Sequence, residues 1–124
     1  MQIQTKKLKI KTQKSPQFID LTDEIVSFVG QSGIKNGQVL VCSQHTTAAI
    51  KINENEPLLI NDMESFLGSL APQDKFYNHN DFEKRTANMQ EDECPNGHAH
   101  CQHLLLATSE TLPVMGGKLK LGVW

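Results

Sequence analysis

Residues 92–103 gather most of the chemically versatile side chains of this chain. The segment reads DECPNGHAHCQH and holds three of the five histidines, two of the three cysteines and two carboxylates. Imidazole, thiolate and carboxylate groups are the side chains that bind metal ions and transfer protons. Pro95-Asn96-Gly97 is a turn signal, and the apolar run Leu104–Leu106 follows the last histidine. The segment therefore predicts a loop that delivers polar groups to the start of a strand.

Side chains on such a strand alternate between its two faces. His98, His100 and Gln102 then share one face, whereas Cys101 and His103 share the other. In this arrangement His98 and His100 can converge on one metal ion or phosphate group, and His103 joins them only through a bulge. The alternative is a polar strand end whose histidines are solvated.

Composition limits the class of protein. A length of 124 residues predicts one domain, residues 1–124, that is large enough to have its own core. The formal net charge of −2 gives no overall field that would recruit nucleic acid. No apolar run fits a signal peptide or a membrane span, so we expect no membrane partner. Three cysteines in an ordinary composition predict reduced thiols and a cytoplasmic protein.

Two main helices are predicted from apolar spacing and capping signals. The first is capped by Asp20 or Thr22 and ends at Gly33, because glycine suits the left-handed cap. The second begins at Pro57, which fits the first helical position, and ends at Ala71-Pro72. The apolar stripes of the two helices are Leu21, Ile25, Phe28 and Val29, and Leu59, Met63, Phe66, Leu67 and Leu70.

Strands are predicted wherever apolar residues alternate or run together between turn signals. The expected strands cover residues 3–12 (with a bulge near Lys6-Lys7), 38–43, 48–53, 98–106, 111–115 and 118–124. Gly116-Gly117 predicts a tight hairpin between the last two. The expected core residues are Val39, Val41, Ile50, Ile52, Leu104 and Leu106. Two helices among about seven strands, with hairpins, indicate an α+β fold with an antiparallel or mixed sheet.

Residues 73–96 show no convincing regular element beyond one turn of helix near residues 82–88. Loops longer than about 12–15 residues are uncommon in compact domains and are usually functional or disordered. This loop is rich in site chemistry and poor in glycine and serine, which is untypical of a plain linker. Its polar and charged side chains are Tyr77, His79, Asn80, Asp81, Arg85, Asn88, Asp92 and Glu93.

Several motifs, taken together and in this order, resemble the YjbQ-like (UPF0047) family, which is also labelled secondary thiamine-phosphate synthase. They are Gln44–Ala48, Asn53–Asn55, Asp62–Glu64, Tyr77–Asp81, Asn96–His100, Leu112–Val114, Gly117–Leu119 and Leu121–Trp124. The resemblance implies a two-layer β-sandwich, a homotrimer and a divalent metal, zinc or similar. Carried over position by position, it implies His45, His79 and His100 as metal ligands, with Glu54, Asp62 and Asp81 nearby.

One departure from the family pattern lies at the end of the sequence. Members continue past the Gly-x-Trp motif with another apolar strand and a basic tail, whereas this sequence ends at Trp124. We therefore expect a single YjbQ-like domain that lacks the family's C-terminal strand. Losing that strand would expose a sheet edge and part of a trimer contact.

Two functions of different classes follow from these residues. The first is a metal-assisted enzyme acting on a phosphorylated small molecule, as a thiamine-phosphate synthase does. Glu54, Asp62 and Asp81 are its candidate catalytic carboxylates, as acceptors for the imidazoles or as a general base. A departing pyrophosphate needs positive charge, yet Arg85 is the only arginine. The second function is a non-catalytic module that binds a metal or small ligand.

A third possibility is a structural zinc site. Its ligands would be Cys94, His98, His100 and Cys101. Strand alternation would turn Cys101 away from both histidines. The spacing also lacks the paired C-x-x-C form that such sites usually have.

Overall fold

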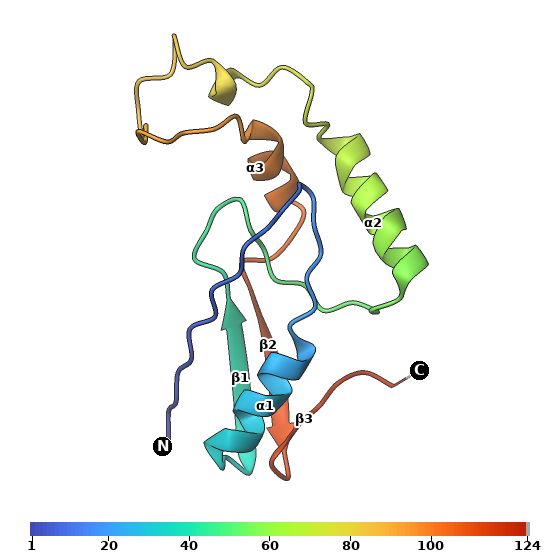
Figure 1. Ribbon diagram of the computed structural model, residues 1–124. Coiled ribbons are helices and arrows are strands. Elements are labelled where there is room, and N and C mark those ends of the chain that lie inside the picture. Colours follow the sequence, from blue (N-terminus) through green and yellow to red (C-terminus); the bar gives the residue numbers. More distant parts are fainter. Residues whose placement is uncertain (124) are drawn as a thin grey trace.

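The computed structural model of this protein describes residues 1–123. Within this range the chain forms α1 (Thr22–Ser32), β1 (Asn36–Cys42), α2 (Pro57–Leu70), the short 3-10 helix η1 (Asn78–Asn80), α3 (Gly97–His103), β2 (Ser109–Met115) and β3 (Lys118–Leu119). Figure 1 shows the strands as one narrow sheet at the bottom of the molecule, with α3 above the upper end of this sheet. The predicted α+β class with an antiparallel sheet is confirmed.

The sheet has the strand order β1-β2-β3, and both pairs are antiparallel. Asn36 pairs with Met115 at one end of β1 and Cys42 pairs with Ser109 at the other. The hairpin between β2 and β3 turns at Gly116 and Gly117, whose φ angles are 60° and 76°. Two consecutive positive φ angles define the primed turn that the glycine pair predicts.

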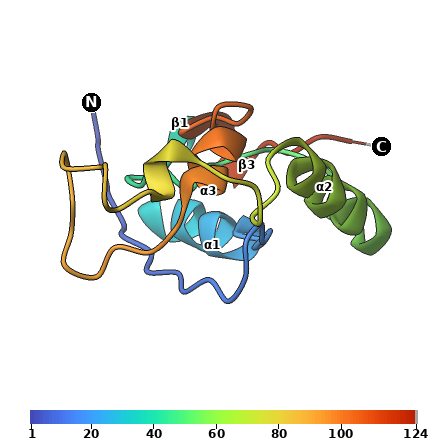
Figure 2. The same ribbon diagram turned by 90° about the horizontal axis from the view of Figure 1, so that it is seen from above.

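The helix α1 lies across one face of this sheet, as Figures 1 and 2 both show. It buries Val29, and β2 buries Leu112 and Val114, two alternate residues that share one strand face. The helix ends where the sequence predicts, because Gly33 adopts the left-handed conformation with φ 70°. Val29 of α1 and Leu112 and Val114 of β2 are therefore the buried apolar residues where the helix meets the sheet.

The helix α2 stands beside the rest of the molecule and is joined to it at its C-terminal half (Figure 2). Its predicted start is confirmed, since Pro57 occupies the first turn and the Glu56 carboxylate accepts hydrogen bonds from the backbone N–H groups of Leu58 and Leu59. Near its end α2 buries Leu67 and Ala71. Their backbone oxygens accept hydrogen bonds from the buried Gln102 amide of α3.

The strand predicted over residues 98–106 is wrong, because residues 97–103 form the helix α3. Helical spacing places His98 and Gln102 on one buried face and turns His100 to another direction. Residues after the helix are turned outward, so Leu104 is 82% exposed rather than part of the core. The period was misread because residues 98–103 are polar and contain no apolar repeat that favours either type of element.

The other predicted strands that differ are residues 3–12 and 48–53. Residues 3–12 pair with no strand in the described part of the chain. Side chains tether them to α1, through Gln4 to the Ser32 oxygen and through Lys6 to Glu24. In the second segment only Ile50 forms a bridge, with Ala107, and Ile52 is exposed. A strand needs a neighbour for its hydrogen bonds. Residues 1–123 therefore contain three strands rather than about seven.

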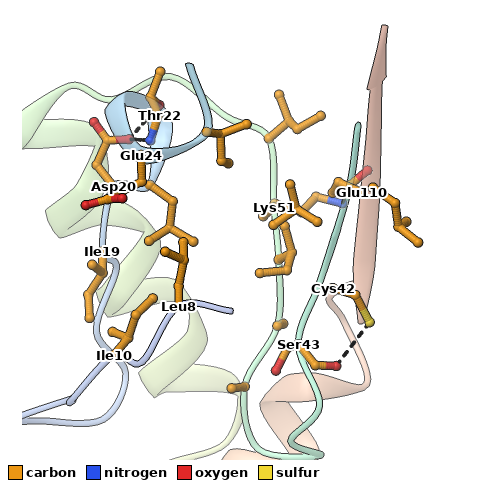
Figure 3. Close-up of a pocket in the computed structure, with 18 of the residues that line it drawn as sticks. Leu8, Ile10, Ile19, Asp20, Thr22, Glu24, Cys42, Ser43, Lys51 and Glu110 are labelled. Atoms are coloured by element: carbon orange, nitrogen blue, oxygen red, sulfur yellow. Dashed lines mark hydrogen bonds and ion pairs between the residues drawn. The ribbon is translucent and has the colours of Figure 1, made fainter. Parts of the chain in front are cut away.

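The molecule exposes much more surface than a folded chain of its mass usually does. Its accessible surface is 9599 Å², whereas a compact monomer of this size exposes roughly 6,700 Å². A broad hollow of about 3210 Å³ lies between the N-terminal segment, α1 and β1. Figure 3 shows Leu8, Ile10 and Ile19 on one side of it and Lys51 with Glu110 on the other. None of the helices in residues 1–123 has the length and apolar character needed to cross a membrane.

Candidate functional site

The three histidines predicted as metal ligands line one cavity of about 720 Å³, which we call the histidine cavity. His45 comes from the loop after β1, His79 from η1 and His100 from α3. The other lining residues are polar or small: Thr46, Thr47, Asn78, Arg85, Ala87, Asn88, Glu93 and Asn96. Segments that are distant in the sequence therefore contribute to one site.

His79 and His100 form the closest pair in this cavity. Their ring centroids are 4.7 Å apart and the rings are nearly perpendicular, at 73°. The Nε2 atom of His79 is buried and has no hydrogen-bond partner among residues 1–123. Buried polar groups are normally paired, so this imidazole nitrogen is available to a further ligand.

The surroundings of His100 favour its neutral form. Burial lowers the pKa of His100, and the positive charges of His79 and Arg85 lower it further. The Arg85 guanidinium, which donates to Glu93 Oε1 at 2.8 Å, lowers the pKa of that carboxyl group. At neutral pH the cavity therefore combines neutral imidazole, the form that binds metals, with an ionised carboxylate.

A set of close contacts fixes η1 against α3 and so positions the two rings. The Asn80 side-chain oxygen accepts hydrogen bonds from the backbone N–H groups of Asn96 and Gly97, at 3.1 and 2.9 Å. A Cβ atom at Gly97 would lie only 2.6 Å from the Cβ of Tyr77, so glycine is required there. The Tyr77 hydroxyl donates to the Pro72 oxygen at 2.8 Å and holds the other side of η1.

His45 reaches the cavity from an exposed loop. Its backbone N–H donates to Ser43 Oγ at 3.2 Å, and its backbone oxygen accepts from Ala48. Its side chain lines the cavity but is exposed, unlike the partly buried His79 and His100. In residues 1–123 no group of three or more His, Cys, Asp or Glu side chains is arranged to hold a metal ion. The structure thus brings two rings together and leaves the third at the rim.

The three carboxylates predicted as catalytic do not line the histidine cavity. Glu54 borders the broad hollow beneath the N-terminal segment. Asp62 is exposed on α2. Asp81 pairs with the exposed Lys84 at 3.1 Å, outside the cavity. The carboxylate that lines the cavity is Glu93, which the sequence offered only as one polar residue of the long loop.

The remaining candidates of the segment 92–103 point elsewhere. His98 is 3% exposed, and its Nε2 lies 3.1 Å from Ser15 Oγ. His103 borders the broad hollow rather than the histidine cavity. Cys94 and Cys101 are free and exposed. The four residues of the predicted zinc site form no metal-holding group in the part of the chain that the structure describes.

Comparison with known proteins agrees with the motifs. Residues 6–124 match the family described as UPF0047 protein YjbQ-like. A UPF0047 protein of Methanothermobacter thermautotrophicus is 36% identical over 124 residues, which are 100% of this chain and 79% of that protein. A second, from Archaeoglobus fulgidus, is 37% identical over 94% of this chain and 82% of its own length.

Solved structures show the same relationship. A YbjQ-like protein of unknown function from Sulfolobus solfataricus superposes with a TM-score of 0.78 at 31% identity, covering 93% of this chain and 75% of the other. An uncharacterized protein of the family from Clostridium acetobutylicum gives 0.76 at 34% identity, over 93% of this chain and 80% of its own. Sequence and fold agree, and the chain belongs to the YjbQ-like UPF0047 family.

Proposed function

We propose that this protein binds a divalent metal ion, zinc or similar, through His45, His79 and His100, and that it acts on a phosphorylated small molecule. The observation that carries the proposal is the contact between His79 and His100, in which one buried ring nitrogen has no partner. The lowered pKa of His100 favours the neutral form that coordinates zinc, nickel or iron. His45 completes the set by a movement of its exposed loop.

The proposed reaction resembles that of a thiamine-phosphate synthase. A divalent metal held by these histidines supplies stabilisation of the negative charge on phosphate oxygens. Of the chain's own residues, Glu93 is the carboxylate available to accept a proton in the cavity, and Thr46 and Thr47 offer hydroxyl groups to a phosphate. Asp81 and Glu54 remain proposed acceptors for the ligating imidazoles or general bases. Either role requires the carboxylate to move to the histidine cavity, which it does not line in this structure.

A second candidate is a non-catalytic module that binds a metal or small ligand. It is favoured by the carboxylates, because Glu54, Asp62 and Asp81 lie outside the cavity and Glu93 is held in an ion pair. A carboxylate whose charge is neutralised by arginine is a weaker base than a free one. Turnover that requires the metal separates the enzyme from the binding module.

We also propose that the protein is a cytoplasmic homotrimer in which a fuller two-layer sandwich forms. The surplus of surface, roughly 3,000 Å² over a compact monomer, exceeds the 1,200–2,000 Å² of a standard interface. Large apolar side chains such as Leu40, Phe66 and Phe76 are exposed. Segment 3–12, and segment 48–53 apart from the Ile50 bridge, offer backbone for further strand pairing. The free cysteines Cys42, Cys94 and Cys101 favour a reducing compartment.

The test begins with elemental analysis of protein purified without a histidine tag, followed by zinc titration calorimetry. His45→Ala and His100→Ala should abolish tight binding. His103→Ala is the matched control, because this histidine is three residues from His100 on the same helix but borders the other hollow. Zinc binding that survives His100→Ala would refute the proposed ligand set.

Activity is then screened against phosphorylated small molecules, with and without a chelator. Metal-dependent turnover supports the enzyme, whereas zinc binding without turnover supports the binding module. Light scattering over a wide concentration range tests the assembly, and a monomer at all concentrations would refute the homotrimer for this chain.

A further inference from the structure

Arg85 lies at the centre of the loop that connects η1 to α3, and it is mostly buried. Its side chain is 14% exposed and that of its partner Glu93 is 11% exposed. The Arg85 Nη1 atom donates to Glu93 Oε1 at 2.8 Å and to the backbone oxygen of His79 at 3.4 Å. Nη2 donates to the Asn88 oxygen at 2.9 Å, and Nε donates to the Ala87 oxygen at 3.3 Å. One guanidinium thus connects η1 with three points of the loop.

These contacts leave the guanidinium with little capacity for a ligand. Its five N–H groups lie in a fixed fork, and four of them are used by the contacts above. Recognition of a phosphate by arginine typically uses two parallel N–H groups, and here a single Nη2 hydrogen remains. Although Arg85 borders the histidine cavity, its hydrogen bonds are therefore directed into the protein.

The backbone around Arg85 is shaped to meet it. Asn88 has a φ angle of 54°, and in residues 1–123 it is the only residue other than glycine with a positive value. Asparagine tolerates this conformation better than most residues, at a modest energetic cost. The Asn88 carbonyl, in this conformation, accepts the 2.9 Å hydrogen bond from Nη2. Such a strained position persists where surrounding contacts hold it in place.

We propose that Arg85 is a positioning residue of the histidine cavity and does not bind the substrate's phosphate. Its hydrogen bond holds the main chain at His79. The position of the main chain in turn sets the angle of the His79 ring against the His100 ring. The inference rests on the proposed metal site for its function, but the ring geometry exists without metal. Lysine cannot replace Arg85, because an ammonium group cannot reach four separate acceptors in fixed directions.

The test compares Arg85→Lys with the control Lys84→Met. Lys84 is the adjacent cation, and it is exposed and pairs with Asp81 outside the cavity. Arg85→Lys should weaken zinc binding about 10–100-fold, the usual effect of removing support for a metal ligand. It should also shift the ring-proton NMR signals of His79 and His100 in the metal-free protein. Lys84→Met should change neither quantity.

The two readouts separate failure of this inference from failure of the metal site. If the unmodified protein binds no zinc, the proposed function fails, and the ring signals of the metal-free variants still decide the role of Arg85. Ring signals that are the same in Arg85→Lys and unmodified protein would overturn the positioning role. If Arg85→Lys does not fold, Glu93→Gln replaces it, and smaller shifts of the same ring signals are expected.

Inorganic phosphate provides the remaining measurement. The Arg85 Nε–H signal should stay unchanged on addition of phosphate to the unmodified protein, because the group is already bonded to the Ala87 oxygen. A shift of this signal that saturates with phosphate would show that Arg85 binds the anion and would overturn the proposal.

Discussion

Replacing Gly97 by alanine tests the contact that positions the two histidine rings. The new methyl carbon would lie 2.6 Å from the Tyr77 Cβ and 2.9 Å from its Cγ. Carbon atoms pack at about 3.5–4.0 Å, so η1 and α3 must separate by about 1 Å. The Tyr77 Cβ is bonded to the backbone and cannot swing aside. Overpacking of this kind lowers the free energy of unfolding by about 1–3 kcal/mol, and we expect Gly97→Ala to lower it by about 2 kcal/mol.

Gly68→Ala is the matched control, because this glycine lies inside α2 and no atom lies within 4 Å of its added Cβ. Alanine is the better helix former by about 0.5–1 kcal/mol, so this variant should be more stable. Urea unfolding followed by circular dichroism measures both changes, provided that the slope against urea stays constant. The reasoning is refuted if Gly97→Ala is as stable as the unmodified protein or more stable.

Three further predictions concern stability and metal binding. Leu104→Ala should change the free energy of unfolding by less than about 0.5 kcal/mol, because Leu104 is 82% exposed, whereas Leu67→Ala, at a site 5% exposed, should cost about 2–5 kcal/mol in the same urea assay. The hydrogen bonds from the backbone N–H groups at the start of α2 lower the pKa of Glu56. The stability that Glu56 adds is therefore fully present above its unfolded pKa and lost as the pH falls through its lower folded pKa. Urea midpoints measured from pH 7 to pH 3 should thus converge with those of Glu56→Gln, and a constant difference would contradict this. Zinc affinity measured by calorimetry should fall at acidic pH, because protons compete for the His100 nitrogen, and the lowered pKa of His100 places this loss below about 6.5.

The sequence predicts those elements whose ends carry a local chemical signal. Gly33 adopts the left-handed cap, Pro57 starts α2, and the Gly116-Gly117 pair forms the turn it predicts. In each case one residue type has a backbone preference that needs no distant partner. Residues 3–12 show the opposite case. Their alternation indicates a strand, but a strand forms only where a neighbouring backbone is in reach, and that information is not local.

The candidate site divides in the same way. Motif resemblance selected His45, His79 and His100, and all three line one cavity. It did not select Glu93, because the importance of this carboxylate depends on its ion pair with Arg85 across eight residues of irregular loop. No periodicity exists in such a loop to predict which side chains meet. The sequence did offer one signal for this ion pair, namely a single arginine in a segment rich in hydrogen-bond acceptors.

The Asn80 side chain that caps α3 also has a consequence for the order of folding. A helix of seven residues is too short to be stable alone, and its first donors are satisfied by an oxygen seventeen residues earlier in the chain. Closing a loop of that length costs about 2.5 kcal/mol of chain entropy before any contact compensates for it. The β2–β3 hairpin, by contrast, closes over two residues. The helix α3 should therefore form after the β2–β3 hairpin, with φ-values lower in α3 than in the hairpin.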